Sequence, residues 1–162
     1  MKKIFTQDLI NKIPLVKGER ILLSGTIYTA RDAAHKRIFE LIENKMPFPF
    51  PIQNTVIYYT GPTPTPPGMI IGSCGPTTSG RMDEYTPLLY NMGLIATIGK
   101  GGRSRKVTES MIKNNAYYLT AAGGAGALYA KCVTKCEEIA FCDLGCESIK
   151  KLIVEDMPLT ME

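Results

Sequence analysis

The adjacent stretches "RILLSGTIYT" (residues 20–29) and "RDAAHKRIFELIENK" (residues 31–45) differ in how their apolar residues repeat. The first is rich in β-branched and aliphatic residues and predicts a strand. The second has a helical repeat with one apolar and one charged face, which are Ala34, Ile38, Leu41 and Ile42 against Lys36, Arg37, Glu40 and Glu43. A strand that leads directly into an amphipathic helix indicates an α/β fold.

The same alternation of strands and helices continues along the chain. Further strands are expected at residues 54–60, 69–73, 94–99, 116–122 and 139–145, and further helices at 86–92, 107–115, 124–138 and 146–156. The proline-rich stretch "GPTPTPPG" (residues 61–68) predicts a stiff loop. Thr86 and Pro87 are typical of a helix N-cap and first helical position, and Gly93 would end that helix. With no linker or internal repeat, residues 1–162 are expected to form one domain.

Length and composition exclude several classes of protein. The 162 residues can bury a core without metal or disulfides, and no apolar run approaches the roughly 20 residues of a membrane helix. The start "MKKIFTQDLINKIPL" lacks the continuous apolar block of a secretory signal, so we expect a cytoplasmic protein. A net charge of +4, without a basic tract interleaved with aromatic residues, argues against nucleic acid and suits a small anionic ligand.

The residues that follow three of the predicted strands share one chemistry. Arg31 and Asp32 follow "GTIYT", and Lys100, flanked by glycines, follows "LIATIG". The stretch "GPTTSGRMD" (residues 75–83) follows "MIIGSC" and contributes Thr77, Thr78, Ser79 and Arg81. Beyond the strand ends of α/β sheets, free N–H groups, hydroxyls and basic side chains bind anions. Each residue alone is equally well explained as a surface charge or a helix cap, but the three groups together predict a site for a polyanion.

These motifs resemble those of a known family. "GTIYTARDAAHKR" (residues 25–37), "GPTTSGRMD", "IGKGG" (98–102) and "DLGCESI" (143–149) stand in the order found in the iron-sulfur hydro-lyases. The whole chain resembles the β subunit, or C-terminal domain, of class I fumarate hydratase. Family members usually continue beyond "VEDMP" (154–158) into a further strand, and this chain departs from that pattern.

The resemblance implies a swivelling β/β/α fold with a mixed sheet. It implies reversible hydration of fumarate to malate, or the equivalent dehydration of tartrate. It also implies a hetero-oligomer, in which the site is shared with a partner α subunit or N-terminal domain that carries a 4Fe-4S cluster. No ligand of that cluster is expected in this chain.

The resemblance also suggests roles for the residues at the strand ends. Arg31, Arg81 and Lys100 would bind the substrate carboxylates, and Thr77 and Thr78 would lie close to the reacting carbons. A threonine hydroxyl is a poor base at neutral pH, so a base role for Thr77 requires nearby cations. Supporting positions behind these groups are expected for three residues: Asp32, His35 and Ser79.

His35 and the cysteines each have two interpretations. His35, the only histidine, is either a half-buried helix residue or a group that orients Arg31 or Asp32. "CVTKC" (132–136) and "CDLGC" (142–146) suggest metal binding, although the two-residue spacing of zinc knuckles is absent. Because the resemblance assigns the cluster to the partner, we expect buried thiols. Cys132 and Cys136 would share one helix face. Cys74 adjoins the site and is either packed in the core or reactive.

Two classes of function stay open from the sequence. One is the catalytic subunit of a fumarate or tartrate hydro-lyase, with "TARDAAH" and "SGRMD" more similar to fumarase. The other is a binding module that kept the dicarboxylate pocket without turnover. The presence or absence of a partner with three cluster cysteines distinguishes them.

Overall fold

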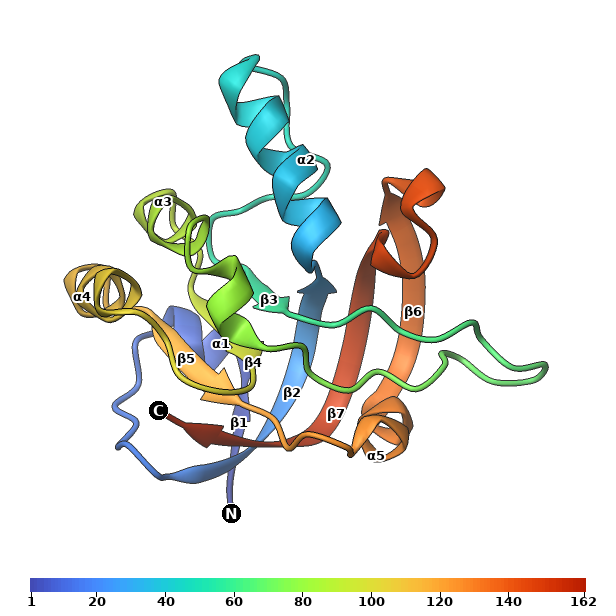
Figure 1. Cartoon of the computed structure of the whole chain (residues 1–162). Coiled ribbons are helices and arrows are strands. Elements are labelled where there is room, and N and C mark those ends of the chain that lie inside the picture. The colour runs from blue at the N-terminus through green and yellow to red at the C-terminus, as the bar shows by residue number, and fades with distance from the viewer.

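The computed structural model describes residues 1–162 and contains one seven-stranded mixed sheet (Figure 1). The sheet has the order β1-β2-β3-β4-β5-β7-β6, with an additional pairing of β2 with β7. Neighbouring strands from β1 to β5 are parallel, and β7 is antiparallel to β2, β5 and β6. The strands are β1 (Lys2–Phe5), β2 (Arg20–Thr29), β3 (Val56–Tyr58), β4 (Ala96–Gly99), β5 (Tyr117–Thr120), β6 (Val133–Ala140) and β7 (Ile149–Met161).

The long strands β2 and β7 close the sheet into a ring. On one edge β2 pairs first with β1 and then with β3, and on the other edge it pairs with β7. The far end of β7 reaches β5, where Thr160 lies opposite Thr120. The closed ring of β2, β3, β4, β5 and β7 confirms the predicted α/β class with a mixed sheet. It is also consistent with the β/β/α domain that the family resemblance implies.

Helices surround this ring and are all short or moderate in length. They are α1 (Thr6–Ile10), α2 (Asp32–Glu43), α3 (Thr86–Asn91), α4 (Arg105–Lys113) and α5 (Gly126–Cys132), with 3-10 helices η1 (Ser79–Met82) and η2 (Cys142–Glu147). Figure 1 shows α2 rising above the end of β2, and α3 beside α4. None of the helices has the length and apolar content needed to cross a membrane.

The alternation of side chains along β3 divides the core in two. Val56 and Tyr58 join the larger core, together with residues of β2, β4, β5 and β7. Ile57 and the following Tyr59 join a second core, which contains buried residues of α2, α3 and α4. Because both faces of β3 are covered, its sequence is an uninterrupted apolar run rather than an alternating pattern.

Most sequence predictions for the first three quarters of the chain are confirmed. The strands at 20–29, 54–60, 94–99 and 116–122 correspond to β2, β3, β4 and β5, and the first three predicted helices correspond to α2, α3 and α4. Gly93 follows α3 with φ +102°. The helix begins at Thr86, whose hydroxyl donates to the Met82 carbonyl instead of capping it, so the predicted cap was wrong. Residues 69–73 form no strand, although they lead into the candidate site as expected.

The predictions for the last quarter were largely wrong. Residues 124–138 were expected to be one helix, but α5 ends at Cys132 and β6 follows. Residues 139–145 were expected to be a strand. Only residues 139–140 lie on a strand, at the end of β6, and residues 142–145 belong to η2. The predicted helix at 146–156 is instead β7. Its apolar residues at 149, 152 and 153 have helical spacing, but pairing with β2, β5 and β6 overrides that local preference.

Candidate functional site

The carboxyl ends of β2, β3, β4 and β5 lie at one end of the ring. Thr29 of β2 is opposite Tyr58 of β3, which is opposite Ile98 of β4, and Gly99 is opposite Thr120 of β5. The residues that follow these strands therefore meet at the same edge, as the sequence analysis predicted. They form two connected groups, which are joined along the chain by η1.

The first group, the hydroxyl loop, consists of residues 77–79 and Lys100. The backbone N–H of Thr77 donates to the Tyr59 carbonyl over 2.7 Å, and the Lys100 N–H donates to the Thr77 carbonyl over 3.3 Å. Thr78 forms a parallel bridge with Lys100, and the Ser79 N–H donates to the Lys100 carbonyl over 2.9 Å. The loop thus runs beside the end of β4, with Thr77 half-buried and Thr78 exposed.

Ser79 is the buried member of the hydroxyl loop. It is fully buried, and the Tyr118 hydroxyl lies 2.9 Å from its Oγ. Gly99 allows this packing, because a Cβ at that position would clash with the Ser79 hydroxyl. The structure therefore places Ser79 behind the surface that Thr77 and Thr78 present.

The second group, the arginine cluster, consists of Arg31, Asp32 and Arg81. Arg81 donates to both oxygens of Asp32, from Nε over 3.0 Å and from Nη2 over 2.6 Å. Arg31 Nε lies 3.4 Å from the same carboxylate and 3.3 Å from Oε1 of Glu147. Partial burial favours a higher pKa for Asp32, but the hydrogen bonds from Arg81 and Arg31 outweigh it and lower the pKa. Asp32 is therefore ionised and links the two arginines.

His35 lies behind Arg31 in the first turns of α2. Its Nδ1 is 2.9 Å from the Arg31 carbonyl oxygen, and its ring lies against those of Tyr59 and Tyr85. Complete burial lowers the pKa of His35 to about 4, so the ring is neutral at pH 7 and Nδ1 donates to the carbonyl. Nε2 is buried without a partner. His35 thus contacts the Arg31 backbone and makes no hydrogen bond to the Arg31 guanidinium or to Asp32.

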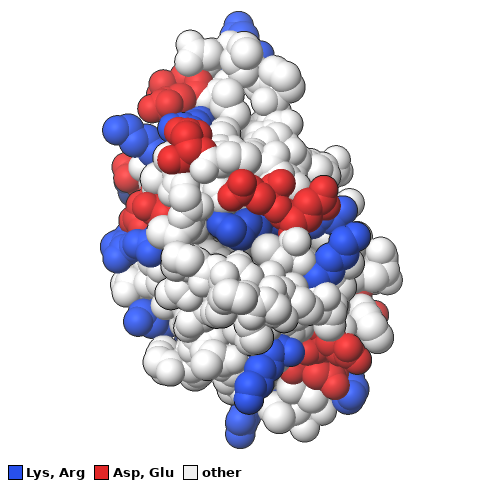
Figure 2. Space-filling view, turned by 90° about the vertical axis from the view of Figure 1, so that its right-hand side faces the viewer, with Lys and Arg blue, Asp and Glu red and all other residues white.

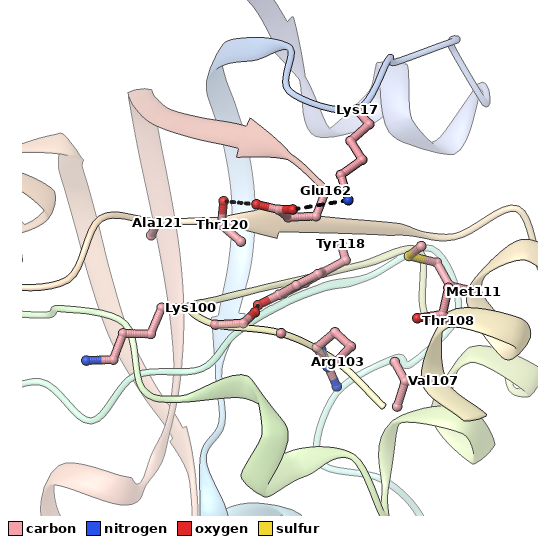
Figure 3. Close-up of a pocket in the computed structure, with 12 residues that line it drawn as sticks. Lys17, Lys100, Arg103, Val107, Thr108, Met111, Tyr118, Thr120, Ala121 and Glu162 are labelled. Carbon is pink, nitrogen blue, oxygen red and sulfur yellow. Dashed lines mark hydrogen bonds and ion pairs between the residues drawn. The ribbon is translucent and has the colours of Figure 1, made fainter. Parts of the chain in front are cut away.

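Lys100 of the hydroxyl loop also lines a cavity. That cavity has a volume of about 650 Å³ and is bordered by Lys100 but not by Arg31, Arg81, Thr77 or Thr78. Figure 3 shows the amino group of Lys100 directed away from Arg103 and Tyr118. Glu162, which also lines this cavity, forms an ion pair with Lys17 over 4.0 Å. The Lys100 side chain lies near Gly123, where an added Cβ would be 3.7 Å from Nζ.

Sequence reasoning missed the ion pair that ties the two site loops together. Arg103 Nε donates to Asp83 Oδ1 over 2.7 Å, and the Arg103 side chain is only 4% exposed. Its guanidinium also donates to the hydroxyls of Thr97 and Thr86 over 3.1 and 2.7 Å. Asp83 ends the stretch "GPTTSGRMD" and Arg103 directly follows "IGKGG", so opposite charges at the ends of two motifs were the available signal.

The cysteines are only partly as expected. All five are free, but only Cys74 is buried, and Cys142 and Cys146 are exposed. Burial raises the pKa of Cys74 to about 12, which favours its interpretation as a packed thiol. Cys132 and Cys136 do not share a helix face, because α5 ends at Cys132 and Cys136 lies on β6. No group of three or more His, Cys, Asp or Glu side chains could hold a metal ion.

The charge on the visible surface is mixed. Figure 2 shows acidic and basic side chains interspersed on the face that is turned toward the viewer, with broad uncharged areas between them. This face presents no continuous basic stripe of the kind that tracks a nucleic acid backbone.

Comparison with known proteins is in line with the motifs. The chain is 43% identical over 143 residues to "Fumarate hydratase 2" of Leishmania major and 41% identical over 160 residues to "Fumarate hydratase class I, anaerobic" of Escherichia coli. These alignments cover 87% and 98% of this chain but 25% and 28% of the relatives, so the chain spans about a quarter of their length.

A shorter relative comes from an archaeon. The "Putative L(+)-tartrate dehydratase subunit beta" of Methanocaldococcus jannaschii is 33% identical over 129 residues, which are 78% of this chain and 66% of that protein. The family model described as "Fumarase C-terminus" matches residues 2–162, nearly the whole chain. This chain therefore belongs to the fumarase C-terminus family of hydro-lyases.

Proposed function

We propose that this protein is the β subunit of a class I fumarate hydratase, which adds water reversibly to fumarate to give malate. One observation carries the proposal: the arginine cluster and the hydroxyl loop lie together at the carboxyl ends of the parallel strands. Relatives named fumarate hydratase support the choice of reaction. A cytoplasmic location is part of the same proposal.

In this proposal three basic residues bind the substrate carboxylates. Arg31 and Arg81 supply planar guanidinium groups, which contact a carboxylate through two parallel hydrogen bonds, and Lys100 supplies a point charge. Asp32 holds Arg81 through both of its oxygens and so fixes the plane of that guanidinium. Preorganised cations are needed because removal of a proton next to a carboxylate places extra negative charge on it in the transition state.

Thr77 and Thr78 are proposed to lie next to the reacting carbons. The peptide groups of the loop are tied to Tyr59 and Lys100, so both hydroxyls are presented from a fixed backbone. We assign proton transfer to Thr77, with its pKa lowered by the neighbouring cations, and seating of a carboxylate to Thr78. Ser79 and His35 keep supporting roles behind the loop and behind Arg31.

The 4Fe-4S cluster is assigned to a partner α subunit. The side chains of this chain do not fit a metal cluster, since no group of three or more suitable ligands lies together. The residues of this chain bind the dicarboxylate, orient it and handle a proton.

Dehydration of tartrate is the second candidate, and the archaeal relative named as a tartrate dehydratase β subunit favours it. Malate and tartrate both present two carboxylates and a hydroxyl group, so the arginine cluster suits either. A binding module without turnover is the third outcome that an assay must separate.

The test is a coupled assay of the chain co-expressed with a partner that carries three cluster cysteines. The pair is reconstituted with iron and sulfide without oxygen and is offered malate, fumarate and both tartrates. Turnover of malate and fumarate is expected. Turnover of tartrate alone would support the second candidate, and dicarboxylate binding without turnover would support the binding module.

A further inference from the structure

We propose that Glu147 is a positioning residue for Arg31. The turn η2, which belongs to neither the hydroxyl loop nor the arginine cluster, thereby contributes to substrate binding. The inference rests on the proposed function, because it acts through an arginine that we assign to the substrate. No motif at the strand ends contains Glu147. It lies in "DLGCESI", more than a hundred residues after Arg31.

Glu147 holds both the side chain of Arg31 and the helix that follows it. Its Oε1 is 3.3 Å from Arg31 Nε and accepts a hydrogen bond from the Ala33 N–H over 3.2 Å. The Ala33 N–H belongs to the first turn of α2, where the helix leaves its N–H groups without partners in the helix. The carboxylate is thus fixed by the backbone and in turn fixes the guanidinium.

The side chain of Arg31 also packs close to a glycine. A Cβ added to Gly61 would lie 2.9 Å from Arg31 Cδ, 3.3 Å from Nη1 and 3.3 Å from the Cys146 carbonyl oxygen. Arg31 therefore lies against both Gly61, which follows β3, and Glu147 of η2. A side chain held by contacts with two segments loses less conformational entropy when it binds a ligand.

The ion pairs of Arg31 involve Nε, so its Nη1 and Nη2 can contact a ligand. Nε makes the ion-pair contacts with both Asp32 and Glu147. Asp32 already accepts two hydrogen bonds from Arg81, so Glu147 supplies Arg31 with a carboxylate that it does not share with that arginine. Arg31 Nε also donates to Asp32 Oδ2 over 3.4 Å, the same oxygen that accepts from Arg81 Nη2. Without Glu147, this shared oxygen would be the only carboxylate contact of Arg31, and the direction of its side chain would be less well fixed.

A second ion pair on η2 provides a matched control. Asp143 accepts from Arg37 Nη1 over 2.7 and 2.9 Å, and Arg37 lies over the Phe141 ring at 5.2 Å. Asp143 is on the same turn and pairs with the same helix, but it makes no ion pair with Arg31. Its side chain is 67% exposed, so loss of its charge is expected to matter little.

The test is a double-mutant cycle in the assembled enzyme. Glu147→Gln is measured in the wild-type and Arg31→Lys backgrounds, with Asp143→Asn as the control. We expect Glu147→Gln to raise KM about tenfold in the wild type and less than twofold in Arg31→Lys, because two groups that act as a unit are not additive. Asp143→Asn should stay within about twofold of the wild type. The proposal would be overturned if Glu147→Gln changed KM equally in both backgrounds or in neither. It would also be overturned if Asp143→Asn raised KM as much as Glu147→Gln does.

A second measurement separates this proposal from the proposed function. In the NMR spectrum of the full chain, the Arg31 Nε–H signal should be resolved in the wild type and in Asp143→Asn, and exchange-broadened in Glu147→Gln. If the Arg31 Nε–H signals behave in this way but the wild-type chain with its partner turns over no substrate, only the proposed function would be overturned. An unchanged Arg31 signal in Glu147→Gln would overturn the positioning role, whatever the activity.

Discussion

Arg103 and Asp83 form a buried ion pair that joins the loop after β4 to the end of η1, with 2.7 Å between Nε and Oδ1. The second oxygen of Asp83 accepts the Ser104 N–H over 2.7 Å, just before α4. The Arg103 guanidinium also packs over the rings of Tyr59 and Tyr118. The two loops that carry the candidate site are therefore held to each other from inside the protein.

This arrangement predicts that Arg103→Met destabilises the protein by about 3–5 kcal/mol, because Asp83 is left as a largely buried charge without its partner. Urea denaturation measures the loss. Adding Asp83→Asn should recover part of the stability. The control is Arg105→Met, whose partner Glu109 and whose own side chain are exposed, and it should leave the midpoint unchanged. Equal midpoints for Arg103→Met and the wild type would contradict the role given to the pair.

Arg31→Ala and Arg81→Ala should each lower kcat/KM roughly 30-fold to 1000-fold in the assembled enzyme, which is a cost of about 2–4 kcal/mol. Each removes a charge-assisted contact to a substrate carboxylate. Lysine at either position should restore only part of the activity, because it lacks the planar fork. Near-normal kinetics for Arg81→Ala in an intact complex would show that this residue is a surface charge paired with Asp32.

Thr77→Val and Thr78→Val should differ in which kinetic constant they change. Loss of a hydroxyl that handles the proton lowers kcat with little change in KM, whereas loss of one that only seats a carboxylate raises KM. Thr77→Ser keeps the hydroxyl and should retain much of the activity. Steady-state kinetics, with iron content and subunit association checked, decide between these roles. If both valine variants keep kcat within about threefold, below roughly 1 kcal/mol, the base must be sought on the partner.

The stability of the chain should fall between pH 6.5 and about 4 because of His35. Burial lowers its pKa in the folded state to about 4, below the ordinary value of 6.5. In this window the unfolded chain binds a proton at His35 that the folded chain does not, so unfolding becomes easier as the pH falls, by up to about 3 kcal/mol. The lowered pKa of Asp32 acts at more acidic pH, below its ordinary value of 3.8.

Because the chain has one histidine, the variant His35→Asn isolates this effect. Its free energy of unfolding should change less between pH 7 and 5 than that of the wild type, although its overall stability is lower. Chemical denaturation at a series of pH values provides both curves. Parallel curves for the two proteins would show that His35 is not the group responsible.

The isolated chain should be colourless and inactive even when iron and sulfide are supplied, because no set of cluster ligands is present in it. Absorption spectroscopy and the malate assay test this directly. A brown, active product from this polypeptide alone would overturn the assignment of the cluster to a partner.

The strands β2 and β4, which lead into the candidate site, could be predicted from the sequence better than the C-terminal fold. Arg31 and Lys100 follow β2 and β4, whose period or apolar run is clear locally, and parallel strands bring their carboxyl ends to one edge. Thr77 follows residues 69–73, which form no strand. The strand β7 carries no such local signal. Lys150 and Lys151 face Glu138 and Glu137 on β6, so its charged residues are explained only by a neighbouring strand that the sequence analysis took for a helix.

The contacts of Glu147, Asp83 and Arg103 depend on the folded structure for a related reason, although opposite charges at the ends of two motifs were a signal for Asp83 and Arg103. Each acts on a residue that is distant in the chain, as Glu147 does on Arg31 and Asp83 on Arg103. A motif shows which residue types stand at a strand end, but the groups that orient them depend on the folded contacts. The motifs therefore contain the residues that we assign to a ligand and some of their supports, such as Asp32 and Ser79, whereas the contact of Glu147 with Arg31 became apparent only in the folded structure.

The closure of the ring by β7 has a consequence for how the protein forms during synthesis. β2 is made early and β7 last among the strands, yet the two share the longest set of paired residues in the sheet. While the ribosome is still adding residues 149–161, β2 and β5 each expose an unpaired edge. Contacts this distant in the chain form slowly, so the edges of β2 and β5 stay open to association with other strands until β7 has been made.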